Sequence, residues 1–181
     1  MPSATIRRCV VLGLASVLAG CRGALPLGSA TGISATAELR DGRNQVVGQA
    51  SFIDVTGGVR IVLEARGLPA GEKAVHLHEV GTCEAPAFTS AGAHFNPQHR
   101  QHGLLNPEGP HAGDLPNITI AENGTGRLET FTDRVTLGAG TTSLFDTDGT
   151  AIVIHADPDD FKTDPAGTSG SRIACGVVTK K

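Results

Sequence analysis

Residues 34–65 read SATAELRDGRNQVVGQASFIDVTGGVRIVLEA, and this stretch decides the fold class. Polar and apolar side chains alternate along three of its segments, residues 34–40, 44–55 and 59–65. Alternation with a period of two is typical of strands that bury one face. Because the turn-forming pairs Asp41-Gly42 and Gly57-Gly58 separate the segments, we expect three strands joined by tight turns.

The rest of the chain contains five further strand-like segments, residues 73–79, 117–121, 126–135, 150–155 and 173–178. The total is about eight short strands, and no segment has a convincing helical period. Two irregular segments interrupt the pattern at residues 80–114 and 157–172. Structureless stretches this long are uncommon inside a compact domain unless they are functional. The sequence therefore predicts an all-β barrel or sandwich with two long functional loops.

The composition agrees with one β-rich domain of ordinary size. The chain has 181 residues, with 24 Gly, 10 Pro and six Phe but neither Trp nor Tyr. Any core must therefore be built mainly from Val, Ile, Leu and Ala. The formal net charge of −3 argues against nucleic acid as a partner.

The N-terminal residues predict export with a lipid anchor. Arg7 and Arg8 precede an apolar stretch, residues 9–20. This stretch is shorter than the about 20 residues that a membrane-spanning helix needs, and it suits a secretory signal. It ends in Leu18-Ala19-Gly20-Cys21, which resembles the lipobox of bacterial lipoproteins. The alternative is a plain signal peptide followed by a chance cysteine, and the arginine pair lacks the flanks of a twin-arginine signal.

These features divide the chain into three parts. We expect a signal peptide at residues 1–20, a lipidated Cys21 with a flexible tether at residues 21–33, and the folded domain at residues 34–181. Cleavage would remove two arginines and leave 13 basic against 18 acidic residues, a formal charge of −5. The protein would be held on a bacterial membrane, at its periplasmic face in a Gram-negative cell. The outer membrane is preferred, because Arg22 stands where an Asp would have indicated retention in the inner membrane.

Two cysteines, Cys83 and Cys175, remain after the signal and the lipidated residue are set aside. Disulfides persist in exported proteins, so one bridge is the default interpretation, and a pair of free thiols is the alternative. The bridge would close a long loop, which the chain-entropy model values at roughly 4–5 kcal/mol.

Six of the seven histidines and one aspartate have the spacing of metal ligands. His76 and His78 lie two apart on a predicted strand, so their rings share one face about 6–7 Å apart. His155 ends another strand and offers a third nitrogen near them. One loop holds three more histidines and a carboxylate, the four ligands of a closed tetrahedral zinc site: His94, His102, His111 and Asp114. A loop wrapped around zinc would need no secondary structure of its own.

Four segments together resemble the copper-zinc superoxide dismutases. They are VHLHEVGTCEAP (75–86), SAGAHFNP (90–97), HGLLNPEGPHAGDLPNI (102–118) and GSRIACGV (170–177), and the resemblance covers residues 34–178. It implies an eight-stranded Greek-key β-barrel or sandwich, an architecture known for this family. It also implies an enzyme with one copper and one zinc per subunit, and it leaves a homodimer open.

The resemblance implies a role for each matching residue. Copper would be bound by His76, His78, His94 and His155, and zinc by His94, His102, His111 and Asp114. His94 would bridge both metals, Asp159 would link a copper ligand to a zinc ligand, and Arg172 would lie beside the copper. Cys83 and Cys175 would form the disulfide.

The implied reaction is 2 O2•− + 2 H+ → O2 + H2O2, with a redox-cycling copper and with His94 as proton partner. Since the mature chain is negative, an anionic substrate needs a local positive funnel made by the metals and Arg172. Lys162 and Arg100 either add to this funnel or are ordinary solvated side chains, and His99 has no family role. Two other functions stay open: a non-catalytic relative that buffers copper, and a surface interaction module. A lost copper ligand would favour the former, and the histidines weigh against the latter.

Overall fold

The quoted stretch forms three antiparallel strands in the computed structural model, which describes residues 30–181. They are β1 (Ala30–Asp41), β2 (Val46–Val55) and β3 (Gly58–Ala65), joined by tight turns as predicted. The strand β1 begins four residues before the expected domain start and carries a register shift between Ala30 and Ser34. The predicted signal peptide, the lipidated Cys21 and most of the tether lie outside the described residues.

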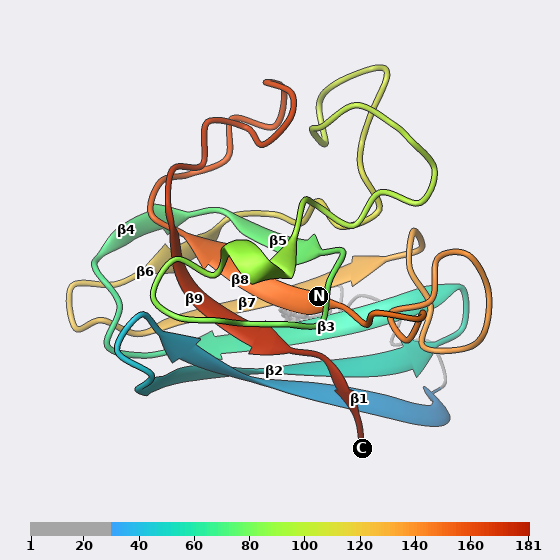
Figure 1. Ribbon diagram of the computed structural model, residues 1–181, viewed down its shortest axis with the longest axis horizontal. Helices are drawn as coiled ribbons and strands as arrows, with labels where there is room; N and C mark the ends of the chain where they lie inside the picture. Colours follow the sequence, from blue (N-terminus) through green and yellow to red (C-terminus); the bar gives the residue numbers. More distant parts are fainter. Residues whose placement is uncertain (1–29) are drawn as a thin grey trace, which may run out of the picture.

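The remaining strands extend this sheet into a nearly closed barrel (Figure 1). They are β4 (Gly71–Lys73), β5 (Val75–His78), β6 (Ile118–Ile120), β7 (Gly126–Thr132), β8 (Ala151–His155), β9 (Arg172–Val177) and β10 (Thr179–Lys180). The strand order is β4-β6-β7-β3-β2-β1-β9-β8-β5, with β10 paired to β1 and every pair antiparallel. Neighbours that are distant in sequence, such as β1 with β9, are Greek-key crossovers, so the predicted all-β barrel is confirmed.

The segment predicted as one strand at residues 73–79 is two strands. The short strand β4 pairs with β6 at one end of the sheet, whereas β5 pairs with β8 at the other end. Ala74, between them, donates its N–H to Asp157 and accepts the N–H of His155. Its backbone bonds therefore serve the β8 side and end the pairing with β6, so the chain crosses from one sheet edge to the other and closes the barrel.

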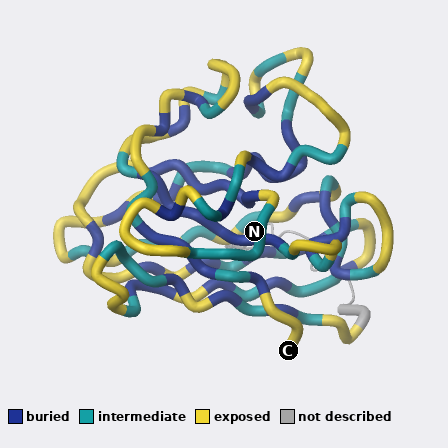
Figure 2. The backbone as a smooth tube through the Cα atoms, in the orientation of Figure 1, coloured by how far each residue is buried: buried dark blue, intermediate teal, exposed yellow. Residues whose placement is uncertain are grey.

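Aliphatic side chains form the core of the barrel. Figure 2 shows buried residues along the strands and many of the exposed residues in the turns and loops. In β3, Val59, Ile61, Leu63 and Ala65 are buried and alternate with less buried residues, as the sequence pattern predicts. In β8 all five residues are buried, because a second apolar cluster covers its outer side. Val153 packs there with Phe88 and Ala91 from the loop that follows β5.

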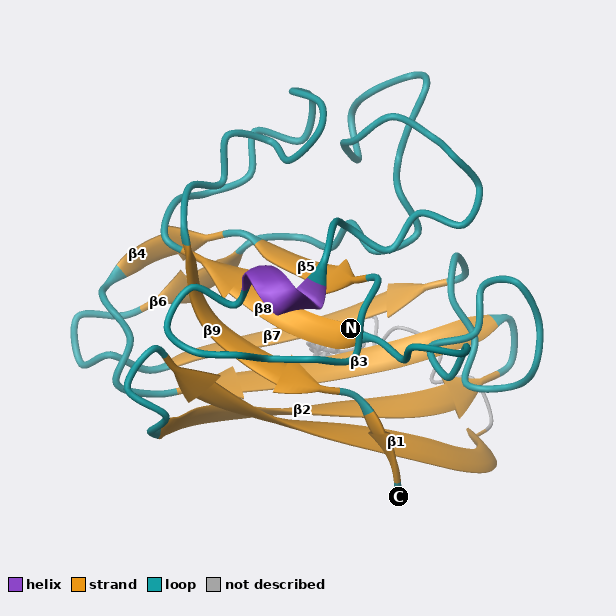
Figure 3. Ribbon diagram, viewed as in Figure 1, coloured by secondary structure: helices purple, strands orange, loops and turns teal. Residues whose placement is uncertain are grey.

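The two long loops extend from the same side of the barrel (Figures 1 and 3). One loop connects β5 to β6 and the other connects β8 to β9. They are hydrogen bonded to each other: Leu105 N–H donates to the Phe161 carbonyl, and Asn117 pairs with the backbone of Asp159 in both directions. We refer to them as the zinc loop (residues 79–117) and the cleft loop (residues 156–171).

Helical structure in residues 30–181 is limited to η1, a 3-10 turn at Thr89–Ala91. No helix in this part of the chain is long and apolar enough to cross a membrane. The predicted disulfide between Cys83 and Cys175 is present, with the two Cα atoms 5.7 Å apart. It fastens the zinc loop to β9 across a sequence separation of 92 residues.

Candidate metal centre

Every predicted metal ligand lies in one buried cluster beside β5 and β8. His76 and His78 come from β5 and His155 ends β8, which pairs with β5. The other ligands lie on the zinc loop, which covers the free edge of β5. Isolated bridges place His94 opposite His78 and Asp114 opposite His76. The strand pairing thus brings together ligands that are up to about 80 residues apart in sequence. The Cα atoms of two residues paired in this way lie within about 5.5 Å of each other.

Three ring nitrogens of the zinc loop converge on Asp114 Oδ1. The distances from this oxygen are 3.0 Å to His102 Nδ1, 3.2 Å to His94 Nδ1 and 3.4 Å to His111 Nδ1. The Nδ1 atoms of His94 and His111 are 3.5 Å apart. A tetrahedron with metal bonds of 2.0–2.1 Å has edges of about 3.3–3.4 Å. These four distances are close to the edges of such a tetrahedron, so His94, His102, His111 and Asp114 could hold zinc.

Asp114 is held in place by its second oxygen. Its Oδ2 accepts the backbone N–H groups of Gly103 at 2.9 Å and His111 at 3.0 Å. Burial alone would raise the pKa of this carboxyl, but the surrounding imidazoles and these N–H groups hold it well below its usual range. Asp114 is therefore ionised and oriented before any metal arrives.

A second set of nitrogens converges on the other side of His94. His76, His78, His94 and His155 each have a ring nitrogen within 4.8 Å of those of the others. His78 donates its Nδ1 proton to the Gly92 carbonyl at 3.0 Å, and its Nε2 lies 3.4 Å from the Nε2 of His155. Two nitrogens, His76 Nδ1 and His94 Nε2, are buried without a hydrogen-bond partner. Orphaned buried imidazole nitrogens are expected where a metal binds, and four imidazoles suit copper.

His94 belongs to both sets. Its Nδ1 faces Asp114 in the zinc half, whereas its unpartnered Nε2 belongs to the group of four imidazoles. One ring therefore presents one nitrogen to each half, so His94 would be a ligand shared by the two metals.

The carboxylate of Asp159 connects the two halves through the outer ring nitrogens of His76 and His102. Its Oδ2 accepts from His76 Nε2 at 2.8 Å and its Oδ1 accepts from His102 Nε2 at 3.0 Å. These bonds leave the Nδ1 atoms of both rings for the metals, which is how outer carboxylates orient metal-binding histidines. Gly167 must be glycine here, since its φ is +62° and a Cβ would overlap the carboxylate.

Burial sets the protonation of the copper half. Burial is the main cause that lowers the pKa of His78 to about 2, of His155 to about 3 and of His94 to about 4. It also lowers the pKa of His76. These rings are therefore neutral at neutral pH, with lone pairs free for a metal. His102 differs: burial would lower its pKa, but the carboxylates of Asp114 and Asp159 raise it to about 9.

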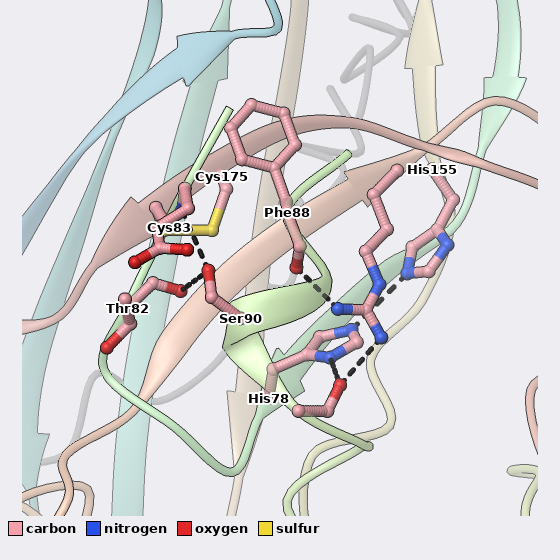
Figure 4. Close-up of a disulfide and its surroundings, with 10 residues drawn as sticks. His78, Thr82, Cys83, Phe88, Ser90, His155 and Cys175 are labelled. Atoms are coloured by element: carbon pink, nitrogen blue, oxygen red, sulfur yellow. Dashed lines mark hydrogen bonds between the residues drawn. A yellow bond between two sulfur atoms is a disulfide. The ribbon is translucent and has the colours of Figure 1, made fainter. Parts of the chain in front are cut away.

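A cleft opens onto the copper half, and Arg172 lies on its wall. The cleft is lined by His78, His94, His155 and Arg172, together with residues 163–166 and 168–170 of the cleft loop. Arg172 begins β9, and its guanidinium donates to the carbonyls of Phe88 and Gly92, both at 2.6 Å. Figure 4 shows the disulfide on one side of the segment that carries Phe88 and Ser90, with His78 and His155 on the other.

Three residues whose roles the sequence leaves open lie outside this centre. Lys162 and Arg100 are exposed, and neither lines the cleft. His99 is exposed as well. The Gly92 carbonyl was not predicted, although it accepts from both His78 and Arg172, because a backbone carbonyl has no residue-type signature. Ser169, whose Oγ lies 3.2 Å from His155 Nδ1, was also missed.

The Greek-key barrel and its two loops thus bury six histidines and Asp114 as two adjoining candidate ligand sets, which Asp159 links. The family model of copper/zinc superoxide dismutase (SODC) matches residues 46–178. The chain belongs to the copper/zinc superoxide dismutase family, as the sequence motifs indicate.

Several relatives are similar over most of their length. "Superoxide dismutase [Cu-Zn] 2" of Aquifex aeolicus is 49% identical over 167 residues, which cover 91% of this chain and 98% of the relative. The "Superoxide dismutase [Cu-Zn]" of Caulobacter vibrioides is 44% identical over 148 residues, 80% of this chain and 85% of the relative. The crystal structure of a SOD-like protein from Bacillus subtilis superposes with a TM-score of 0.76 at 35% identity, covering 80% of this chain and 97% of that one.

Proposed function

We propose that this chain dismutates superoxide with copper held by His76, His78, His94 and His155 and zinc held by His94, His102, His111 and Asp114. Membership of the family makes it a copper- and zinc-dependent superoxide dismutase. The observation that carries the residue assignment is His94, which presents one ring nitrogen to each ligand set. Copper, when bound, supplies the one-electron redox chemistry that converts two superoxide anions to O2 and H2O2.

His94 supplies the proton coupling. Its Nε2 is buried, has no protein partner and lies on the side of the cleft, so it is the atom at which a proton is held and then delivered to product. Its Nδ1 stays on the side of Asp114, which keeps the ring in place while the proton moves.

Arg172 receives the anionic substrate. Two of its donors are used by the carbonyls of Phe88 and Gly92, which fix the guanidinium on the cleft wall. A guanidinium is always charged and offers a planar fork of donors, so it attracts an anion and orients it toward the imidazoles.

The test is His155→Ala, with His99→Ala as the matched control. His155 contributes to the copper half alone, so its loss should abolish superoxide consumption while the purified protein still takes up about one zinc. His99→Ala should keep both metals and full activity, since His99 is exposed and outside the cluster. Retained dismutation in His155→Ala would remove this residue from the copper site. Full loading with both metals in the unchanged protein without turnover would favour a copper-buffering relative instead.

We also propose that the mature protein is a lipoprotein attached through Cys21 to a bacterial membrane, facing the periplasm in a Gram-negative cell, with the outer membrane preferred. The apolar stretch at residues 9–20 and the tetrad that ends in Cys21 support this location. The variant Cys21→Ala should move the protein from the membrane fraction to the soluble fraction. Persistent membrane fractionation would contradict the anchor. Sedimentation of the released protein would decide whether it is a homodimer, which stays a prediction.

A further inference from the structure

Asp164 of the cleft loop lies where the copper cleft and the zinc site meet. It is one of the residues that line the cleft, and its side chain is 51% exposed. The polar contacts of its side chain are with the zinc loop. This residue has no part in either ligand set, and no sequence motif includes it.

The carboxylate of Asp164 contacts two of the residues assigned to zinc. Its Oδ1 accepts the backbone N–H of His102 at 2.6 Å. The same oxygen lies 3.9 Å from Nε2 of His111. Nδ1 of His111 faces Asp114 in the zinc half, so with zinc bound at Nδ1 the ring proton would be on Nε2. A negative charge at 3.9 Å is too far for a direct hydrogen bond but close enough to stabilise that proton.

The three histidines of the zinc half differ in what lies at the ring nitrogen that points away from Asp114. His102 has Asp159 behind its outer nitrogen, and His94 uses its outer nitrogen on the copper side. His111 has Asp164 as the carboxylate nearest its outer nitrogen. Histidines that bind metals nearly always have an acceptor at the outer nitrogen, which fixes the ring and raises its basicity.

The position of Asp164 is unfavourable for the substrate. A carboxylate on the wall of a cleft that admits an anion lowers the local positive potential that Arg172 provides. Removing this charge alone should therefore help superoxide to enter. If Asp164 holds the zinc ligands, that benefit offsets the weaker attraction of superoxide. If it has no such role, its charge only slows the entry of substrate.

We infer that Asp164 is a positioning residue for the zinc site, which secures His102 and His111 and thereby fastens the cleft loop to the zinc loop. The inference rests on the proposed zinc ligands. It makes zinc occupancy and the shape of the substrate cleft interdependent, because one side chain contacts the former and lines the latter.

The experiment compares Asp164→Ala with Glu108→Gln in the full-length mature protein. Glu108 lies on the zinc loop and is exposed, and within residues 30–181 no hydrogen bond or ion pair involves its side chain, so it controls for the loss of one negative charge. Zinc affinity is measured by chelator competition, and Co2+ in place of zinc reports the tetrahedral site by its visible absorption. Asp164→Ala should weaken zinc binding about tenfold and alter the Co2+ spectrum, while Glu108→Gln changes neither.

Two further measurements, activity with saturating metals and the zinc affinity of Asp164→Asn, distinguish a positioning role from a loss of folding. With zinc and copper saturating, Asp164→Ala should dismutate superoxide at least as fast as the unchanged protein at low salt. Asp164→Asn keeps an oxygen for the His102 N–H but loses the charge, so its zinc affinity should lie between the two. Zinc affinity of Asp164→Ala within twofold of the unchanged protein would overturn the inference. Absence of a tetrahedral Co2+ spectrum from the unchanged protein would instead overturn the zinc site itself.

Discussion

At the scale of single residues, the Gly92 carbonyl joins binding of substrate to binding of copper. It accepts the Nδ1 proton of His78 at 3.0 Å and a guanidinium N–H of Arg172 at 2.6 Å. The φ of +74° at Gly92 favours glycine, and a Cβ there would collide with the side chain of Glu79. One backbone oxygen thus fixes both the tautomer of a copper ligand and the position of the cationic group beside it.

The electrostatic role of Arg172 gives a test at this scale. Arg172→Ala should lower kcat/KM for superoxide by about tenfold or more and flatten its dependence on ionic strength, because the local attraction is lost. Lys162→Ala is the matched control, since it removes one positive charge from the adjoining cleft loop at a residue that does not line the cleft. Association rates at several salt concentrations provide the measurement. An unchanged salt profile in Arg172→Ala would assign the attraction to other groups.

At the scale of elements, the disulfide holds the zinc loop against the strand that carries Arg172. Cys83 lies early in the zinc loop, and Cys175 follows Arg172 by three residues on β9. Cys175 and the nearby Phe88 and Ala91 form the apolar cluster on the outer side of β8. The bridge therefore anchors the segment whose Phe88 and Gly92 carbonyls hold the guanidinium.

Loss of the bridge should affect both stability and activity. The double variant Cys83→Ser/Cys175→Ser should lose about 2–5 kcal/mol of unfolding free energy, the usual cost of removing a native disulfide. Its kcat/KM should fall as well, because the two carbonyls that hold Arg172 become mobile. Urea unfolding and superoxide consumption are compared with those of the unchanged protein with and without reductant. An unfolding free energy within about 1 kcal/mol of the oxidised protein would contradict a stabilising role.

At the scale of the whole molecule, the barrel buries a set of ionisable groups that metals normally satisfy. Without metals, His76, His78, His94 and His155 have folded-state pKa values below 6.5, so the unfolded chain binds more protons at lower pH. Stability from these rings is present above pH 6.5 and is lost as the pH falls toward 4 and below. His102 acts in the opposite sense. Its pKa of about 9 contributes stability that is full below pH 6.5 and disappears as the pH rises through 9.

The metal-free protein should therefore be most stable near neutral pH and lose stability in both directions. The urea midpoint in the presence of a chelator, measured from pH 4 to pH 10, checks this. His102→Gln is the informative variant, since it should remove the alkaline decline while leaving the acid decline. A midpoint that stays constant between pH 6.5 and pH 4.5 would show that the four copper-side rings are not buried in the neutral form.

Sequence patterns predicted the strands and singled out the candidate ligands that the structure brings together, because both depend on local spacing. The alternation at residues 59–65 required one buried face, and the pair His76 and His78 required one shared side of a strand. The break at Ala74 was missed because it depends on bonds to Asp157 and His155, which are distant in sequence. Asp164 and the Gly92 carbonyl were missed for the same reason. Their roles arise from where two loops meet, and a single sequence carries no signal for that.

The pairing of β10 with β1 bears on how the domain can be attached to a surface. Lys181 N–H donates to the Ser34 carbonyl, so the first strand and the end of the chain are neighbours. In Figure 1 the C-terminus lies on the side of the barrel opposite the two loops. A bead or electrode coupled through a C-terminal tag would therefore leave the cleft open to solution, and a circular permutant could join Lys181 to β1 through a short linker.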